Sequence, residues 1–235
     1  MLSDPGVRTR GWLGGVRRWL AVALLVAGVA LLAWVIGFSG LFGVKYVDVV
    51  GVRLLNADEV RTAAAVPLGT PLIRLDAQAI ERRISALPEV RRVKVSTSYP
   101  AGVELVITER VAVGYRDIGG AAELVDGSDV AFHTIARPPA GLPALDGSVD
   151  PARSQAAAAV AAALPDTVAR MVVSISAPTV ESVTCKLSDE RVVLWGGTDR
   201  NADKARLLPA VLSQPGSYFD VSDPDAVISR GASGH

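Results

Sequence analysis

The chain has a single cysteine, Cys185, among its 235 residues. One cysteine cannot close a disulfide within a chain, so the folded parts must be stabilised by hydrophobic cores. An excess of charge of either sign is also missing, because 24 basic residues balance 24 acidic ones. A composition without a basic surplus does not indicate a nucleic-acid partner.

Residues suited to catalysis are scarce as well. The two histidines are His133 and His235, and no serine or cysteine nucleophile motif accompanies either of them. Cys185 alternates with polar neighbours along a predicted strand, which favours a small core residue over a reactive thiol. Asp126 and Asp129 bracket a predicted turn without further spaced ligands, so they predict no metal site. We therefore predict no enzymatic activity, no cofactor and no metal, with an anchored cell-wall hydrolase as the enzymatic alternative.

Charge is absent from residues 19–44, and residues 19–38 are almost wholly apolar. At about 1.5 Å per residue, a helix of this length covers the roughly 30 Å hydrocarbon layer of a membrane. We predict a transmembrane anchor with its outer flank at residues 19–43. A cleaved signal peptide is the alternative, but its apolar core is normally shorter and ends at small residues spaced A-x-A. No second apolar run of this length follows, which predicts a single pass.

Flanking charges predict the orientation of this anchor. One lysine and one aspartate follow the apolar run, whereas four arginines and a single aspartate precede it. Positive residues are retained on the cytoplasmic side of a membrane, so residues 1–18 are predicted to be a cytoplasmic tail. Everything from about residue 44 onward is predicted to lie outside. The four arginines are Arg8, Arg10, Arg17 and Arg18.

A helix-period pattern is the clearest signal in the next segment. Ile80, Ile84 and Leu87 recur on one helical face, Asp76 is a suitable N-cap, and Pro88 prevents continuation. Two runs of alternating apolar and polar residues follow at once, joined by a turn at residues 99–102, and predict a hairpin with one buried face.

The preceding residues supply the other half of the same domain. Residues 44–52 alternate as a strand, and Asn56 with Glu59 three residues later resembles a capping box at the start of a helix. The predicted order is strand, helix, helix, strand, strand. Two amphipathic helices can bury their apolar faces on a small sheet, which predicts a two-layer α+β domain at residues 44–112.

Beyond residue 112 the pattern becomes strand-dominated, and we predict a strand-rich β-domain with two helices at residues 113–228. Residues 137–147 are rich in proline and glycine and predict an irregular connection. Residues 229–235 are predicted to be a disordered tail. The predicted helices are 153–164 and 202–212, and the predicted strands are 123–125, 172–175, 183–187, 191–195, 218–221 and 226–228.

The order and spacing of several short motifs resemble the FtsQ (DivIB) family of bacterial cell-division proteins. Two positions depart from the family pattern: Ala112 stands where the family has a proline, and Gly127 follows Asp126 immediately. The motifs that carry the resemblance are Val47-Asp48-Val49-Val50-Gly51, Gly69-Thr70-Pro71-Leu72, Leu87-Pro88-Glu89-Val90, Tyr99-Pro100, Val106-Ile107-Thr108-Glu109-Arg110, Leu124-Val125-Asp126, Leu142-Pro143-Ala144-Leu145-Asp146-Gly147, residues 192–196 with Lys204, and Phe219-Asp220-Val221-Ser222.

The resemblance implies a POTRA domain followed by a β-domain, and a non-enzymatic scaffold of the divisome at the division septum in the cell membrane. It implies that the external domains bind the small single-pass proteins FtsB (DivIC) and FtsL and link early septal components to the septal peptidoglycan synthase complex. The contact segment carried over from the family is residues 218–230, where a partner strand would add to an edge strand. The alternative is a last strand that only completes its own sheet. Candidate partner-binding residues are Tyr218, Phe219, Val221, Ala226, Val227, Ile228 and Arg230.

Two further surfaces follow from the charges of the first domain. Arg91, Arg92 and Lys94 are basic residues of one predicted strand, which is typical of a solvated strand face, and the resemblance implies a recruitment surface as the other interpretation. Glu109 and Arg110 are predicted to form an ion pair at the corner between the domains, with a contact to a partner protein as the alternative. The second non-enzymatic alternative is a POTRA-containing scaffold of secretion or envelope assembly, but the chain holds no second copy of the strand-helix-helix-strand-strand pattern.

Overall fold

The computed structural model describes residues 12–38, 43–146 and 150–231. Within the first range, side chains are described for residues 18–32, 34 and 35. The chain contacts itself as two compact units. The first comprises Met1–Ala86 and Arg92–Thr108, and the second comprises Leu87–Arg91 and Glu109–His235.

Helix α1 is Trp12–Phe38 and therefore begins within the predicted cytoplasmic tail. Its leucines and valines between residues 20 and 32, among them Leu24 and Leu25, are exposed. Among the described residues, no helix combines the length and the hydropathy that a membrane crossing requires. The anchor at residues 19–43 stays a prediction.

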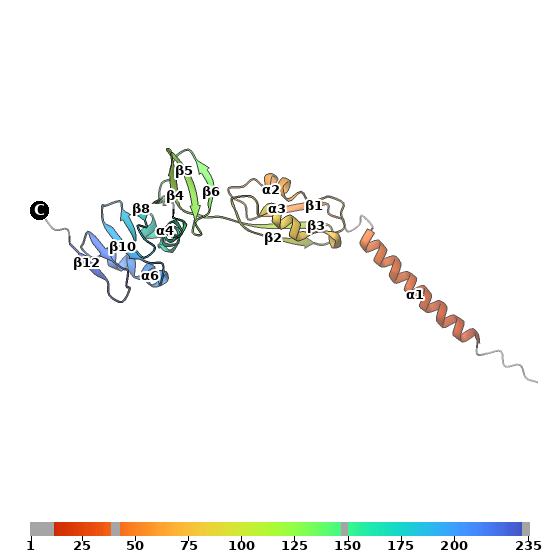
Figure 1. Ribbon diagram of the computed structural model, residues 1–235. Coiled ribbons are helices and arrows are strands. Elements are labelled where there is room, and N and C mark those ends of the chain that lie inside the picture. The colour runs from red at the N-terminus through yellow and green to blue at the C-terminus, as the bar shows by residue number, and fades with distance from the viewer. Residues whose placement is uncertain (1–11, 39–42, 147–149, 232–235) are drawn as a thin grey trace, which may run out of the picture. The chain divides into compact units, whose positions relative to one another are not determined.

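A three-stranded sheet with two helices forms the first unit, in the predicted element order. The strands lie in the order β1-β3-β2, with β1 parallel to β3, and the helices lie against the sheet (Figure 1). The buried side chains are those that the alternation and the helical period place inward: Val60, Ala64, Ile80, Ile84, Val103, Leu105 and Ile107. The elements are β1 (Tyr46–Val50), α2 (Ala57–Ala64), η2 (Leu72–Arg74), α3 (Ala77–Ile84), β2 (Val90–Ser98) and β3 (Gly102–Glu109).

Aspartate and asparagine side chains cap both helices of this unit. Asp76 Oδ1 accepts from the backbone N–H of Ala79 at 2.9 Å, as predicted for the N-cap of α3. Asn56 caps α2, but its Oδ1 accepts from the N–H of Asp58 at 2.9 Å and not from that of Glu59, the position a capping box would use. An N-cap side chain can accept from the second or the third N–H of its helix, and Asn56 uses the second.

The second unit is built on one nine-stranded sheet, in the order β12-β11-β10-β9-β8-β7-β4-β5-β6. Neighbouring strands are antiparallel except at β4–β7, β7–β8 and β10–β11. The strands are β4 (Ala112–Ile118), β5 (Ala121–Asp126), β6 (Ala131–Ile135), β7 (Ala144–Leu145), β8 (Val172–Ser176), β9 (Val183–Leu187), β10 (Val192–Gly196), β11 (Tyr218–Asp220) and β12 (Ile228–Arg230), and the helices are α4 (Pro151–Ala163), α5 (Asp166–Ala169) and α6 (Asn201–Leu212).

Some of these elements differ from the prediction. Strand β7 lies inside the segment predicted as irregular, and α5 was not expected at all. The two residues of β7 are held only because β4 and β8 flank them, a non-local pairing without a local sequence signal. Strand β12 is Ile228–Arg230, so it shares only residue 228 with the predicted strand 226–228 and ends two residues beyond the predicted domain end. Residues 232–235 of the predicted tail lie outside the described residues.

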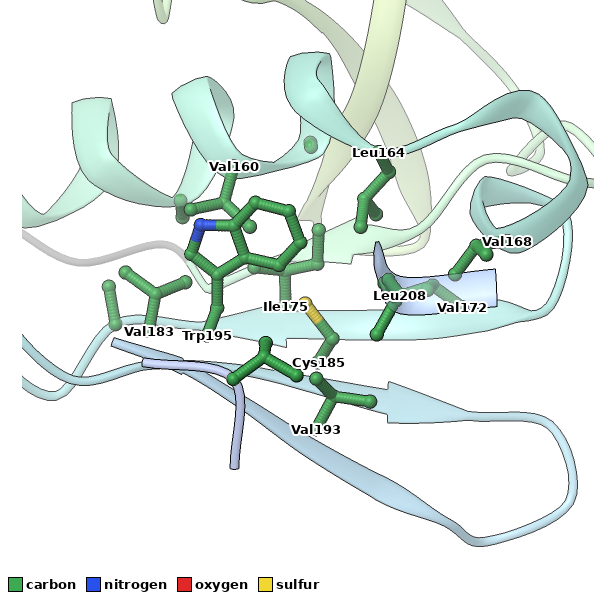
Figure 2. Close-up of a cluster of buried hydrophobic side chains, with 14 of the residues drawn as sticks. Val160, Leu164, Val168, Val172, Ile175, Val183, Cys185, Val193, Trp195 and Leu208 are labelled. Atoms are coloured by element: carbon green, nitrogen blue, oxygen red, sulfur yellow. The ribbon is translucent and has the colours of Figure 1, made fainter. Parts of the chain in front are cut away.

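The core of the second unit lies between the sheet and the alanine-rich helix α4. Figure 2 shows the indole of Trp195 next to Val160 of α4, with Ile175, Cys185 and Val193 below it. All these side chains are buried, and the indole N–H donates to Asn201 Oδ1 at 2.8 Å. Small alanine side chains let α4 approach the sheet closely, which explains how so uniform a helix packs.

Arg110 follows β3 in the chain and belongs to the second unit, as do its partners Pro88 and Asp126. Its guanidinium donates to Asp126 Oδ2 at 2.6 Å and to the backbone oxygen of Pro88 at 3.0 Å. Asp126 is therefore an ion-pair partner of Arg110, which the sequence pattern did not predict. Burial by itself raises the pKa of Asp126, but the N–H of Val130, the Arg110 guanidinium and the N–H of Ser128 together lower that pKa below its ordinary value.

This arrangement makes the stability of the second unit depend on pH. A lowered folded-state pKa means that ionised Asp126 stabilises the fold above the unfolded-state pKa of about 3.9, and that this stabilisation is lost as the pH falls through the folded-state value. We expect Asp126→Asn to lower the free energy of unfolding at pH 7, with a gap to the wild type that narrows below about pH 4. Urea unfolding of the variant and the wild type at pH 7 and below about pH 4 measures this difference in the free energy of unfolding. The exposed Asp146→Asn is the control, and a gap independent of pH would contradict the prediction.

Candidate partner-binding edge

Strand β12 is the end strand of the nine-stranded sheet. On one side it pairs antiparallel with β11, with Tyr218 opposite Arg230 and Asp220 opposite Ile228. On its other side no strand follows among the described residues. An end strand presents backbone N–H and C=O groups that a further strand can bond. The edge predicted for residues 218–230 therefore exists in the fold as the three residues of β12.

The side chains of this edge are accessible. Ala226, Val227, Ile228 and Arg230 are all exposed, and Tyr218 is half-buried. The Arg230 guanidinium lies over the Tyr218 ring at 5.9 Å from its centroid, within the range of a cation–π contact. Five of the seven candidate residues thus reach the surface, and two of them already contact each other.

The other two candidates, Phe219 and Val221, are fully buried in the core of the second unit. The Arg191 guanidinium lies 5.7 Å from the centroid of the Phe219 ring. Successive side chains of a strand point to opposite faces, so inward Phe219 leaves Tyr218 outward. The buried pair cannot act as side-chain anchors for a partner unless the core opens.

Arg200 holds the loop between β11 and β12. Its guanidinium donates to both carboxylate oxygens of Asp225, at 2.8 and 3.2 Å, and lies 3.6 Å from Asp223 Oδ1. The hydrogen bond from Arg200 lowers the pKa of Asp225, and the same bond raises the pKa of Arg200. Arg200 has a positive φ of 51°, a backbone conformation that few non-glycine residues adopt. Asp223 and Asp225 lie more than twenty positions away from Arg200, so no local pattern predicted these contacts, although Arg200 Nε also lies 3.5 Å from Asp203 Oδ2.

The loop between β11 and β12 passes close to the end of β10, shortly before α6 begins. A Cβ on Gly196, whose φ is +79°, would lie 2.6 Å from Ser222 Cβ, so only glycine fits where β10 passes the loop. The fully buried Lys204 donates through Nζ to the backbone oxygen of Gly197 at 3.1 Å and lies 3.6 Å from Asp199 Oδ1. Arg200 stands between these residues in the chain and is positioned by them.

The chain is similar in sequence to known cell-division proteins. A model of the POTRA domain of FtsQ type matches residues 42–110. Cell division protein FtsQ of Streptomyces venezuelae is 37% identical over 247 residues, covering 98% of this chain and 90% of that protein. The chain belongs to the FtsQ family. FtsQ of Mycolicibacterium smegmatis is 41% identical and FtsQ of Mycobacterium tuberculosis is 38% identical, and the chain covers 88% and 92% of its own length in the two alignments.

The chain spans 64% of the length of the M. smegmatis relative and 69% of that of M. tuberculosis. The solved extracytoplasmic domain of the cell division protein DivIB from Geobacillus stearothermophilus covers 45% of this chain and 93% of its own. Its TM-score of 0.36 at 18% identity is too low to support an argument about this FtsQ chain.

The basic residues of β2 lie in the POTRA domain of this FtsQ chain. Arg91, Arg92 and Lys94 are exposed, as both interpretations of them require. Strand β2 is an end strand of the three-stranded sheet, and Glu81 Oε1 accepts from its Val95 N–H at 3.0 Å. A side chain thus occupies one backbone donor of this edge, which makes it less open to strand addition than β12.

The residues considered for catalysis or metal binding are buried or contact other side chains of the fold. Burial raises the pKa of the Cys185 thiol to about 12, so the reactive thiolate is disfavoured. His133 Nδ1 lies 3.3 Å from Glu89 Oε1. The carboxylate of Asp129 accepts from Arg116 and from Ser154 Oγ, which joins the β5–β6 turn to β4 and α4. Among the described residues, no three histidine, cysteine or acidic side chains gather as a metal site.

Removing Arg200 should loosen the loop that leads into β12. Arg200→Asn keeps a residue that tolerates positive φ but deletes the contacts to Asp223 and Asp225. We expect faster amide hydrogen exchange in residues 222–230 with a nearly unchanged unfolding midpoint, because exposed ion pairs contribute little to global stability. Arg206→Asn, which removes another exposed arginine of α6, is the control. Unchanged exchange in the loop would show that Arg200 does not hold it.

Proposed function

We propose that this chain is a non-enzymatic scaffold of the divisome at the division septum. It links early septal components to the septal peptidoglycan synthase complex by binding FtsB (DivIC)-like and FtsL-like single-pass proteins through its external domains. Membership in the FtsQ family supports the divisome role. The observation that carries the binding proposal is β12, an end strand with an accessible backbone and exposed side chains.

The scaffold is anchored by one membrane-spanning helix, with residues 1–18 in the cytoplasm and the residues from about 44 onward outside. Its support is the uncharged run at residues 19–44, the arginines that precede it, and the exposed leucines and valines of α1. Large apolar side chains exposed along the described part of α1 favour another apolar environment, and a bilayer supplies one.

A partner binds at β12 by strand addition. The free backbone groups of β12 bond to an extended partner segment, and side chains of alternate residues determine which segment fits. Ile228 offers an apolar contact and Arg230 a positive charge, and the side chain of Arg230 already contacts Tyr218. An extended segment with an apolar residue and an acidic residue at alternate positions matches this edge. The core positions Phe219 and Val221 contribute by holding β11 in place.

A charged side chain at Ile228 should block the partner without unfolding the chain. Ile228 is 46% exposed in the free chain, so Ile228→Asp costs little there but would bury an unpaired charge in the complex. We expect at least roughly tenfold weaker binding, which corresponds to about 1.4 kcal/mol. The measurement is a titration of the full chain in nanodiscs with an FtsB-like protein, alone and together with an FtsL-like protein.

Ile118→Asp is the matched control, because Ile118 is 49% exposed and lies on β4, in the other half of the sheet. Val227→Pro tests the backbone separately, since proline removes an N–H and restricts the residue before it. Circular dichroism confirms that each variant is folded. Wild-type affinity in both Ile228→Asp and Val227→Pro would refute binding at this edge.

Arg91, Arg92 and Lys94 form the proposed recruitment surface of the POTRA domain. Replacing all three with serine removes three exposed positive charges from β2, and we expect the fluorescently tagged chain to lose its midcell position while staying in the membrane. The control replaces Arg170, Lys186 and Arg206, three exposed basic residues of the second unit, with serine. Normal midcell localisation of the β2 variant would leave these residues as a solvated strand face.

A further inference from the structure

The point where the chain enters the first unit is enclosed by two loops. The N–H of Val44 donates to Thr70 O at 3.0 Å, and the N–H of Gly69 donates to Val44 O at 2.8 Å. The N–H of Lys45 donates to Ala101 O at 2.8 Å, in the turn between β2 and β3. We call the surface formed by residues 43–45, 68–74 and 99–101 the tether end.

Gly43 shows how closely these segments pack. It forms a bridge with Pro71, and a Cβ on Gly43 would lie 2.6 Å from the carbonyl oxygen of Gly69. The two backbones are therefore in direct contact, and the loops of the tether end have a defined position relative to residues 43–45. Side chains on these loops share one end of the domain.

Three large side chains at this end have no place in the core. Leu68 is 69% exposed, Ile73 is 72% exposed and Tyr99 is 72% exposed. Leu72 and Ile73 are consecutive residues of the single turn η2. Leu72 is only 4% exposed, so the core takes one of these two aliphatic side chains and leaves the other at the surface. Large apolar side chains left exposed at one end of a domain are typical of a binding surface.

Charges at the tether end are mainly positive. Lys45 and Arg74 are exposed there, and the nearest acidic residue along the chain, Asp76, uses its carboxylate to cap α3. Aliphatic side chains together with tyrosine and basic residues form the combination found at membrane–water interfaces, where the aliphatic groups enter the acyl region and the others remain at the headgroups.

The connection to α1 is short. From Phe38, the last residue of α1, to Gly43 is a step of five residues, which at about 3.5 Å each spans at most about 18 Å. A surface tethered so closely to a membrane-spanning helix meets the bilayer at a high effective concentration, so a weak contact is enough to keep it there.

We propose that the tether end of the POTRA domain rests on the outer leaflet of the bilayer that holds α1, with Leu68 and Ile73 inserted below the headgroups and Tyr99 among them. This inference rests on the proposed function, because it requires α1 to be in the membrane. The contact restricts how the domain tilts above the membrane and thereby orients the surfaces that receive partners.

The test uses the full chain in nanodiscs, with an environment-sensitive fluorophore on one introduced cysteine at a time. Leu68→Cys and Ile73→Cys report on the tether end, and Leu25→Cys reports on α1. Leu54→Cys is the matched control, since Leu54 is 60% exposed but follows the opposite end of β1. Cys185 is buried and is replaced by alanine in all variants to prevent labelling. Lipids carrying a nitroxide near the headgroup or near the acyl end serve as quenchers.

We expect quenching at residues 25, 68 and 73 and none at residue 54, with residues 68 and 73 more sensitive to the headgroup-proximal nitroxide. Quenching at residue 25 alone would overturn the lipid contact and leave the anchor proposal standing. Absence of quenching at residue 25 would overturn both. Equal quenching at residues 54 and 68 would mean that the domain has no preferred face, and shielding of residues 68 and 73 only after partner proteins are added would assign this surface to a protein; both results contradict the proposal.

Discussion

Burial of Phe219 in the core of the second unit is the constraint on which the candidate site depends. Phe219 packs among the side chains beneath α4 and holds β11 beside β10, so the strand cannot slip without exposing a large aromatic ring. The same alternation turns Tyr218 outward, toward Arg230 of the next strand. The exposed positions of Tyr218 and Arg230 at this edge therefore depend on the burial of Phe219, which is not accessible from the surface.

Hydrophobic burial does not determine the course of the chain between β11 and β12; polar contacts do. Arg200 binds two carboxylates of that loop, and Gly196 lets β10 pass close to it. These groups are near the surface and contribute little to global stability. Their effect is local, because they limit the positions from which β12 can begin. On the proposed function, an edge that is ordered before a partner arrives loses less entropy on binding.

Both proposed contact surfaces contain apolar side chains that the core does not bury. At η2 the core accepts Leu72 and excludes Ile73, and at the sheet edge it accepts Phe219 and leaves Ile228 outside. Amphipathic period and alternation were enough to predict the helices and most strands around these residues, because both signals are local. The short β7 and the contact between Arg200 and Asp225 could not be predicted, since each depends on segments far apart in the sequence.

By itself the amino-acid sequence determined the order of the elements in the POTRA domain and membership in the FtsQ family, because periodicity, caps and motif spacing are properties of short segments. Only the tertiary structure decided which strand is last in the nine-stranded sheet and which aromatic residue faces inward. It also decided that Arg110 pairs with Asp126. Such outcomes depend on which segments meet when apolar faces are buried together, and no single segment contains that information.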